Sequence, residues 1–163
     1  MDKVAFFLGK WRGKGLVLGV PKSPVNYLEE TTFTLVRTEP AIVISLQQYT
    51  RHAESGAPMH AENGFLKILP AMDGMNGRAV EMMLSHPFSL NEFEYGTYDG
   101  ESLRVESSKL DHFQRGITAK GKQATSFRRE YWLNKKGHLC YKMYLGVDGA
   151  DPYEHLNGEL EPV

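Results

Sequence analysis

The stretch Leu139-Cys140-Tyr141-Lys142-Met143-Tyr144-Leu145-Gly146-Val147 alternates in character with a period of two residues. Its apolar members share one face of an extended chain: Leu139, Tyr141, Met143, Leu145 and Val147. The segment just before it, Asn134-Lys135-Lys136-Gly137, is a tight-turn sequence of the kind that right-twisted hairpins favour. The stretch therefore predicts an antiparallel β-strand that is entered through a hairpin.

The same alternation recurs along the rest of the chain. It is clearest at residues 41–53, 80–86 and 124–134. Turn-forming residues separate these runs at 55–58, 72–77, 99–100 and 148–152. About ten strands result, with helical periodicity only at Val4–Leu8, where we expect a short N-terminal helical turn.

Many antiparallel strands joined by short turns favour closure, because a closed sheet has no exposed edges. We therefore predict an all-β fold, an up-and-down barrel of about ten strands that is similar to lipocalins and fatty-acid-binding proteins. A barrel of this width leaves an internal cavity.

Composition narrows the class of protein. The 163 residues suit one domain, which we expect to cover 1–163. The formal charge is −1, from 19 basic and 20 acidic residues, so we expect no nucleic-acid partner. The apolar piece within Met1–Lys10 is too short for a signal peptide or a membrane span. The single cysteine, Cys140, excludes an internal disulfide and a thiolate zinc site, and it fits a cytoplasmic location.

Four segments, in this order, carry a resemblance to a known family. They are Gly9-Lys10-Trp11-Arg12-Gly13-Lys14-Gly15, Tyr27-Leu28-Glu29-Glu30-Thr31-Thr32-Phe33, Pro58-Met59-His60-Ala61-Glu62-Asn63-Gly64-Phe65 and His155-Leu156. Together they span nearly the whole chain, which resembles the nitrobindin family. The resemblance implies a ten-stranded barrel that binds ferric haem b, binds nitric oxide and isomerises peroxynitrite to nitrate. It therefore implies an enzyme, and it leaves a homodimer open as the assembly.

The resemblance also implies which residues hold the cofactor. His155 matches the axial ligand of the haem iron, which would leave the sixth coordination position open. Lys120 matches a lysine near the haem edge, where a cation suits a propionate. Leu145, by its strand alternation, is an expected apolar wall contact, and Met59 is assigned to the haem-binding residues as well.

Two further histidines are the predicted catalytic residues. His60 matches the distal histidine of the family, and His86 matches a residue of the pocket wall that would donate a hydrogen bond to a bound anion. Alternation alone does not decide whether the face of His60 or the more apolar face of Met59 lies inside the barrel. His86 shares its face with apolar residues at 80, 82 and 84, so it enters the cavity if that face is interior.

The segment Gly9–Gly15 also has a structural interpretation. Glycines 9, 13 and 15 alternate on one strand, which relieves crowding where another backbone passes close. Trp11 is expected to plug one barrel end. Glu29 and Glu30 point to opposite faces and so do not form a catalytic pair.

One segment departs from the family, and it supports a second hypothesis. Where the family has G-x-Y-P-T-I beside the haem, this chain has Leu18-Gly19-Val20-Pro21-Lys22-Ser23-Pro24. The changed Val20–Pro24 loop leaves haem retention open. The alternative is a lipocalin-like carrier of a fatty acid or another apolar molecule, without haem. Arg128 and Arg129 are adjacent, so only one of them can face a carboxylate inside the barrel.

Overall fold

The computed structural model describes residues 5–19, 22–107 and 109–163. The alternating segments form strands, because every second side chain is buried in one interior. Within the described residues there are eleven strands: β1 (Gly9–Val17), β2 (Val25–Arg37), β3 (Ile42–His52), β4 (Pro58–Ile68), β5 (Arg78–His86), β6 (Leu90–Tyr98), β7 (Ser102–Ser107), β8 (Phe113–Arg115), β9 (Ala124–Leu133), β10 (Leu139–Val147) and β11 (Tyr153–Pro162).

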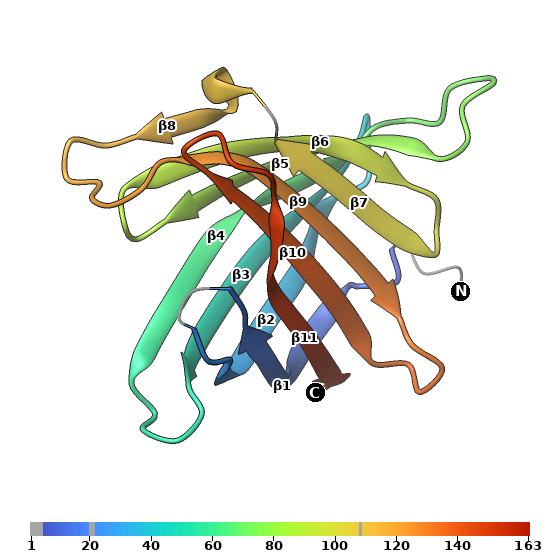
Figure 1. Ribbon diagram of the computed structural model, residues 1–163. Helices are drawn as coiled ribbons and strands as arrows, with labels where there is room; N and C mark the ends of the chain where they lie inside the picture. The colour runs from blue at the N-terminus through green and yellow to red at the C-terminus, as the bar shows by residue number, and fades with distance from the viewer. Residues whose placement is uncertain (1–4, 20–21, 108) are drawn as a thin grey trace.

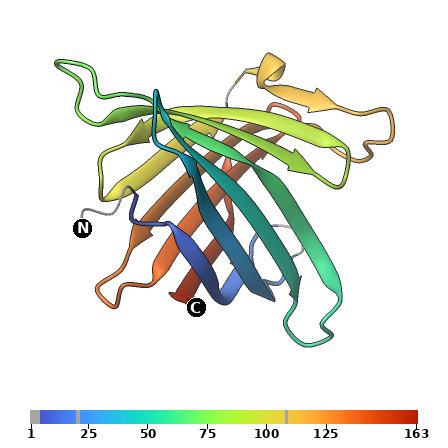
Figure 2. The ribbon, with the colours of Figure 1, turned by 180° about the vertical axis from the view of Figure 1, so that it is seen from behind.

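The sheet closes into a barrel (Figure 1). Its strand order is β5-β4-β3-β2-β1-β11-β10-β9-β7-β6, and pairing of β5 with β6 completes the ring. All pairings are antiparallel, so the predicted ten-stranded barrel is confirmed. The short β8 is an addition that pairs with the first residues of β6, on the edge of β6 whose other end pairs with β7, and both views place it beside the β5–β6 hairpin (Figure 2).

Apolar side chains fill one end of the barrel. An aromatic group packs there, in which the Phe7 ring lies 5.1 Å from Phe33 and 5.8 Å from Tyr98. Trp11 is buried beside it and donates its Nε1–H to the carbonyl oxygen of Phe7 at 2.7 Å. The expected plug role of Trp11 fits this position. A second, smaller cluster lies elsewhere in the interior and consists of Leu90, Phe113, Phe127 and Met143.

Helical structure is scarcer and differently placed than expected. Val4 lies outside the described residues, and Ala5–Leu8 form one turn, closed by a 3.4 Å hydrogen bond from Leu8 N–H to the Ala5 carbonyl. The expectation of a helical turn there is corrected to a non-helical one. Among the described residues, the one helix is the 3-10 turn Leu110–His112. No helix in that part of the chain is long and apolar enough to cross a membrane.

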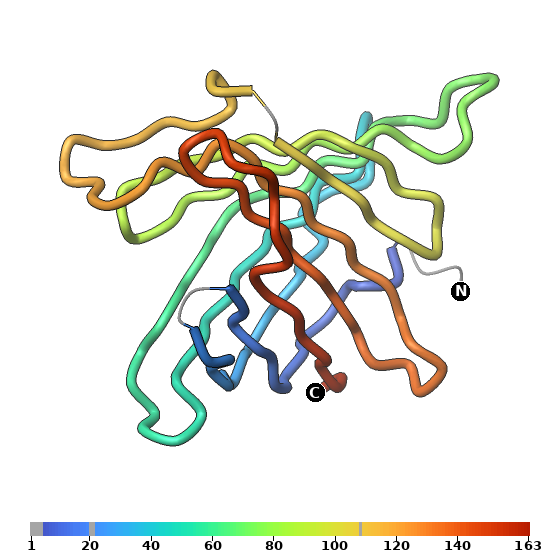
Figure 3. The backbone as a smooth tube through the Cα atoms, in the orientation of Figure 1, coloured from blue at the N-terminus to red at the C-terminus, as the bar shows by residue number. Residues whose placement is uncertain are grey.

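Among the loops that extend beyond the ring, two lie on opposite sides of the barrel (Figure 3). They are the β3–β4 turn at residues 53–57 and the β4–β5 loop at residues 69–77, both placed where turn residues predicted connections. Neither contributes a residue to the interior cavity described next.

Candidate functional site

A cavity of about 410 Å³ lies inside the barrel. This volume falls in the range of about 300–1,000 Å³ that small-molecule sites occupy. Its walls are largely apolar and include Val17, Phe88, Phe127, Met143, Leu145 and Leu156. The barrel interior is therefore packed at one end and hollow at the other, as a ligand-binding barrel requires.

His155 lines this cavity from β11. Its Nδ1 lies 3.2 Å from the carbonyl oxygen of Leu18, and the two residues also share a 2.7 Å backbone hydrogen bond. When Nδ1–H donates to that carbonyl, the lone pair of Nε2 is left for a ligand. Burial lowers the pKa of His155, which favours the neutral imidazole that binds metals. Its predicted role as the axial ligand stays a prediction, and the geometry suits it.

His60 and His86 meet on the opposite wall. His60 Nε2 lies 3.1 Å from His86 Nδ1, and the rings are 5.1 Å apart. Buried His86 also contacts Glu92, whose Oε1 lies 3.1 Å from His86 Nε2. Strands β4 and β11 stand four places apart in a ring of ten, so these histidines and His155 face each other across the barrel. The inner face of β4 is thus the one that carries His60.

A buried guanidinium organises the wall behind the histidines. Arg129 donates to Glu62 at 2.6 and 3.1 Å, to Glu92 at 2.7 Å and to Glu94 at 2.6 Å. Burial opposes the charge of Arg129, but the three carboxyl groups raise its pKa well above the ordinary value. Burial alone would raise the pKa of Glu62, but Arg129, His60 and His86 together outweigh burial, and the pKa is lowered. Glu62 is therefore ionised inside the barrel.

Sequence reasoning missed this network. It recognised that one of two adjacent arginines faces inward, but it did not find the partners of Arg129. Glu62, Glu92 and Glu94 lie on inward positions of their strands, and that alternation was the available signal. The sequence alone did not predict which strands face each other across the barrel interior.

A second polar group lies beside the cavity and is centred on Glu29. The buried carboxyl of Glu29 accepts hydrogen bonds from Gln48, Thr31 and Tyr141, and Tyr141 in turn contacts the hydroxyl of Tyr27. Burial raises the pKa of Glu29, which favours its protonated form. Glu30 is exposed and pairs with an arginine at 3.5 Å, so the predicted separation of the two glutamates is observed.

The remaining predicted site residues separate into two groups. Leu145 and Met59 line the cavity, although Met59 is 41% exposed and lies at its rim. Lys120 is exposed in a loop and is not among the residues that line the cavity. Val20 and Pro21, in the loop that departs from the family pattern, lie outside the described residues.

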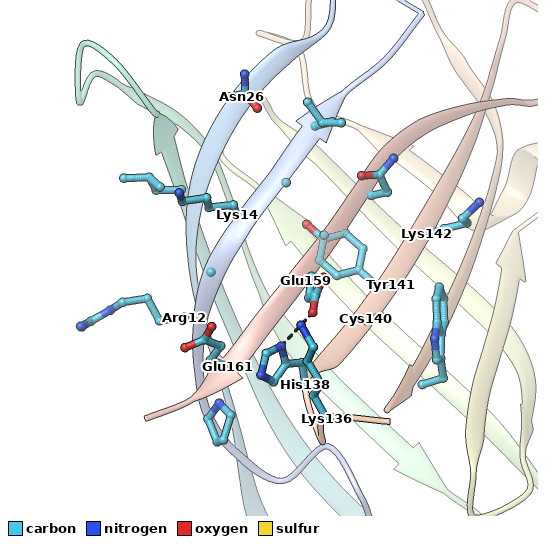
Figure 4. Close-up of a pocket in the computed structure, with 18 of the residues that line it drawn as sticks. Arg12, Lys14, Asn26, Lys136, His138, Cys140, Tyr141, Lys142, Glu159 and Glu161 are labelled. Carbon is cyan, nitrogen blue, oxygen red and sulfur yellow. Dashed lines mark hydrogen bonds and ion pairs between the residues drawn. The ribbon is translucent and has the colours of Figure 1, made fainter. Parts of the chain in front are cut away.

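A broader depression of about 990 Å³ lies on the outer face of β1, β10 and β11 (Figure 4). Arg12, Lys14 and Lys142 stand around it, and His138 contacts Glu159 at 2.8 Å within it. It is shallow and mixed in charge. The enclosed cavity is the better candidate site, because it combines apolar walls with converging polar groups.

The residues of the cavity suit a haem. One neutral imidazole, oriented by a backbone carbonyl, stands on one wall, and apolar side chains form the surroundings that a porphyrin needs. The wall opposite His155 is polar, so a small ligand would meet hydrogen-bonding groups there.

Comparison with known proteins agrees with this geometry. Residues 1–161 match the model of the family described as the THAP4-like, heme-binding beta-barrel domain. The chain is 31% identical over 160 residues to peroxynitrite isomerase 2 of Mycobacterium marinum, covering 98% of this chain and 92% of that protein. It is 32% identical over 158 residues to peroxynitrite isomerase 1 of Mycolicibacterium paratuberculosis, covering 96% and 91%.

Among solved structures, the crystal structure of Rv2717c from M. tuberculosis matches with a TM-score of 0.77 at 30% identity. That match covers 97% of this chain and 93% of the other. The resemblance to nitrobindins inferred from four motifs is confirmed. The chain belongs to the family of THAP4-like, heme-binding beta-barrel domains.

Proposed function

We propose that this barrel binds ferric haem b through His155 and isomerises peroxynitrite to nitrate. Family membership and the names of two relatives support the activity. The observation that carries the proposal is a single neutral imidazole facing a polar pair of histidines across an apolar cavity. When bound, the haem supplies an electron-poor iron that assists the shift of the terminal oxygen of peroxynitrite onto nitrogen. Reversible binding of nitric oxide at the same place belongs to this proposal.

The chain's own contribution begins with orientation. The Leu18 carbonyl fixes the ring of His155, and the fixed ring presents Nε2 to the cavity. Apolar residues around it exclude water, which favours transfer of a porphyrin from solvent and strengthens polar interactions inside. Leu145 and Met59 would contact the macrocycle from β10 and β4. Lys120, in its exposed loop, remains a proposed partner of a propionate.

His60 and His86 would serve the substrate. Because Glu92 accepts from Nε2–H of His86, the Nδ1 lone pair of His86 accepts from Nε2–H of His60. This relay holds a proton at Nε2 of His60, beside the cavity. Substrate binding would redirect this proton from His86 Nδ1 to the oxygen atoms of peroxynitrite as their charge shifts. Glu92 and Arg129 act as positioning residues behind the histidines.

The carrier hypothesis is less well supported. A fatty acid would need a free cation for its carboxylate, and the inward arginine is Arg129. Three carboxyl groups already occupy the guanidinium, with Glu62 bound through both oxygens. A fourth carboxylate would add negative charge to a buried site that already holds more acidic than basic groups.

The test is haem reconstitution followed by mixing with peroxynitrite. We expect a Soret band with wild-type protein, and a lost or strongly shifted band with His155→Ala. Nitrate yield, measured against nitrite in a rapid-mixing experiment, should rise with the wild-type complex. His60→Ala should retain the Soret band and lose about 10²–10³-fold in rate, as for removal of one positioned donor.

His138→Ala is the matched control, because His138 is a partly buried histidine on the outer face. It should leave both the spectrum and the rate unchanged. A His155→Ala spectrum identical to that of the wild type would remove the axial assignment. Haem binding without any gain in nitrate would support the haem-binding part of the proposal and reject the isomerase activity.

A further inference from the structure

We propose that His60, Glu62 and His86 form a second metal site, which takes a divalent first-row transition metal such as Zn²⁺. These residues come from adjacent strands β4 and β5 and line the cavity wall that faces His155. The donor set, two imidazoles and one carboxylate, is that of the facial triad used by non-haem metal enzymes. The site does not depend on haem and is argued from its own geometry.

The three donor atoms are already separated by about the distances that separate ligands of one metal ion. His60 Nε2 is 3.1 Å from His86 Nδ1, and Glu62 Oε2 is 3.6 Å from each of those nitrogens. Zinc binds nitrogen and oxygen ligands at about 2.0–2.2 Å, so tetrahedral ligands lie about 3.4 Å apart. Closing the triad around an ion therefore requires shifts of only a few tenths of an ångström.

The protonation pattern leaves lone pairs directed at the centre of this triangle. Glu92 accepts from Nε2–H of His86 at 3.1 Å, which leaves the lone pair of His86 Nδ1 facing His60 and Glu62. Glu62 Oε2 is also an acceptor: Arg129 donates to it at 3.1 Å and to the other oxygen at 2.6 Å, and each carboxylate oxygen keeps a second lone pair. Two acceptors that face each other at 3.6 Å need a positive or protonated group between them. In the metal-free protein, Nε2–H of His60 supplies it, and a metal ion can replace that proton.

The surroundings supply what a metal site requires beyond its ligands. His86 donates to a carboxylate, and Glu62 is hydrogen-bonded by an arginine, so both ligands are oriented by a second set of contacts. Glu62 supplies an ionised carboxylate to the site, and Glu92 is a second acidic group beside it, which favours a dication. Glu92 Oε2 and Glu94 Oε2 have no hydrogen-bond partner among the described residues. His60 is 30% exposed, which gives an ion a route of entry and a place for a water molecule as fourth ligand.

The experiment titrates the haem-free full-length chain with Zn²⁺ and with Co²⁺. Calorimetry and elemental analysis after desalting should show one Zn²⁺ bound per chain, and Co²⁺ should develop visible bands of a low-coordinate site. His60→Ala should weaken Zn²⁺ binding by at least about 100-fold, because it removes a ligand. Glu92→Gln should weaken it by about 10–100-fold, because it removes the negative charge of the group that orients His86.

His155→Ala and His138→Ala are the controls. Both should bind Zn²⁺ like the wild type. His155→Ala should nevertheless lose haem binding, so the experiment distinguishes failure of the zinc proposal from failure of the haem proposal. His60 is partly exposed, and unchanged circular dichroism of its variant would show that it still folds. Absence of stoichiometric Zn²⁺ binding to the wild type would overturn the proposal. So would equal Zn²⁺ binding by His60→Ala, or loss of binding in His155→Ala.

Discussion

Arg128 and Arg129 are neighbours in the sequence, but they lie on opposite faces of β9 and differ in burial. Arg128 lies on the outer face, 4.1 Å above the Tyr144 ring, whereas Arg129 is buried against three carboxyl groups. We expect Arg129→Leu to lower the free energy of unfolding by about 3–5 kcal/mol, because it leaves carboxylates buried without a counter-charge. Arg128→Leu should change it by about 1 kcal/mol or less. Urea unfolding of both variants is the measurement, and similar losses would show that the buried network contributes little.

Glu94 predicts a pH dependence of stability. Burial raises the pKa of its carboxyl well above the ordinary value, against the charge of Arg129. Above pH about 4.5 the carboxyl group of Glu94 loses its proton in the unfolded chain but keeps it in the folded chain. Because the folded chain then binds more protons, the free energy of unfolding falls as the pH rises. Glu94→Gln keeps a neutral group at this position, so its unfolding free energy should decline less between about pH 5 and pH 8.

Urea unfolding across that pH range measures the effect. Glu81→Gln is the control, because Glu81 lies on the same barrel but is partly exposed and paired with Lys67 at 3.3 Å. Its decline should match that of the wild type. An identical decline in Glu94→Gln would show that Glu94 is already ionised in the folded protein.

At the level of single residues, sequence reasoning found the histidines and missed the buried charged residues that contact them. His155, His60 and His86 were identified because they matched motifs or shared a face with apolar residues. The same face of β4 carries Glu62, but alternation could not decide which face was interior. That decision depends on partners from β6 and β9, which are 30 to 67 residues away along the chain. Long-range pairing of charges is therefore the part that the sequence did not reveal.

At the level of strands, glycines explain how β1, β2, β10 and β11 pack. A side chain at Gly13 would meet the backbone of Glu159 at 2.1 Å, as expected from close backbone approach. At Gly158 a Cβ atom would lie 2.4 Å from the Tyr141 ring. The strand order was predictable only as far as consecutive hairpins go. The pairing of β1 with β11 and the extra β8 depend on closure of the whole sheet.

This packing predicts the effect of a single methyl group. Gly158→Ala should lower the free energy of unfolding by about 1–3 kcal/mol, because Tyr141 must move away from its buried partners Glu29 and Tyr27. Glu161→Ala, at an exposed position of the same strand, should stay within about 0.5 kcal/mol. Thermal or urea unfolding compares the two. Equal stability of Gly158→Ala and wild type would mean that the Tyr141 ring is loosely held.

The molecule as a whole divides its interior between stability and binding. One end is filled by an apolar cluster that includes fully buried Phe7, Ile44 and Leu66, and the other contains the cavity with its charged wall. A barrel of ten strands is too wide for side chains to fill everywhere, so one packed end can stabilise the fold while the other stays open. The buried charges stand beside the cavity, where their cost to stability is compatible with a functional role.

This division predicts opposite effects for the same type of substitution at the two ends. Leu145→Phe adds apolar volume to the cavity, so it should raise the free energy of unfolding by about 0.5–2 kcal/mol and weaken haem uptake. Leu46→Phe adds the same volume to the packed end, where Leu46 is 2% exposed, so it should lower stability by about 1–3 kcal/mol. Urea unfolding and haem titration of each variant test both halves of the prediction. Full haem uptake by a stabilised Leu145→Phe protein would place the haem outside this cavity, because its space would then be filled.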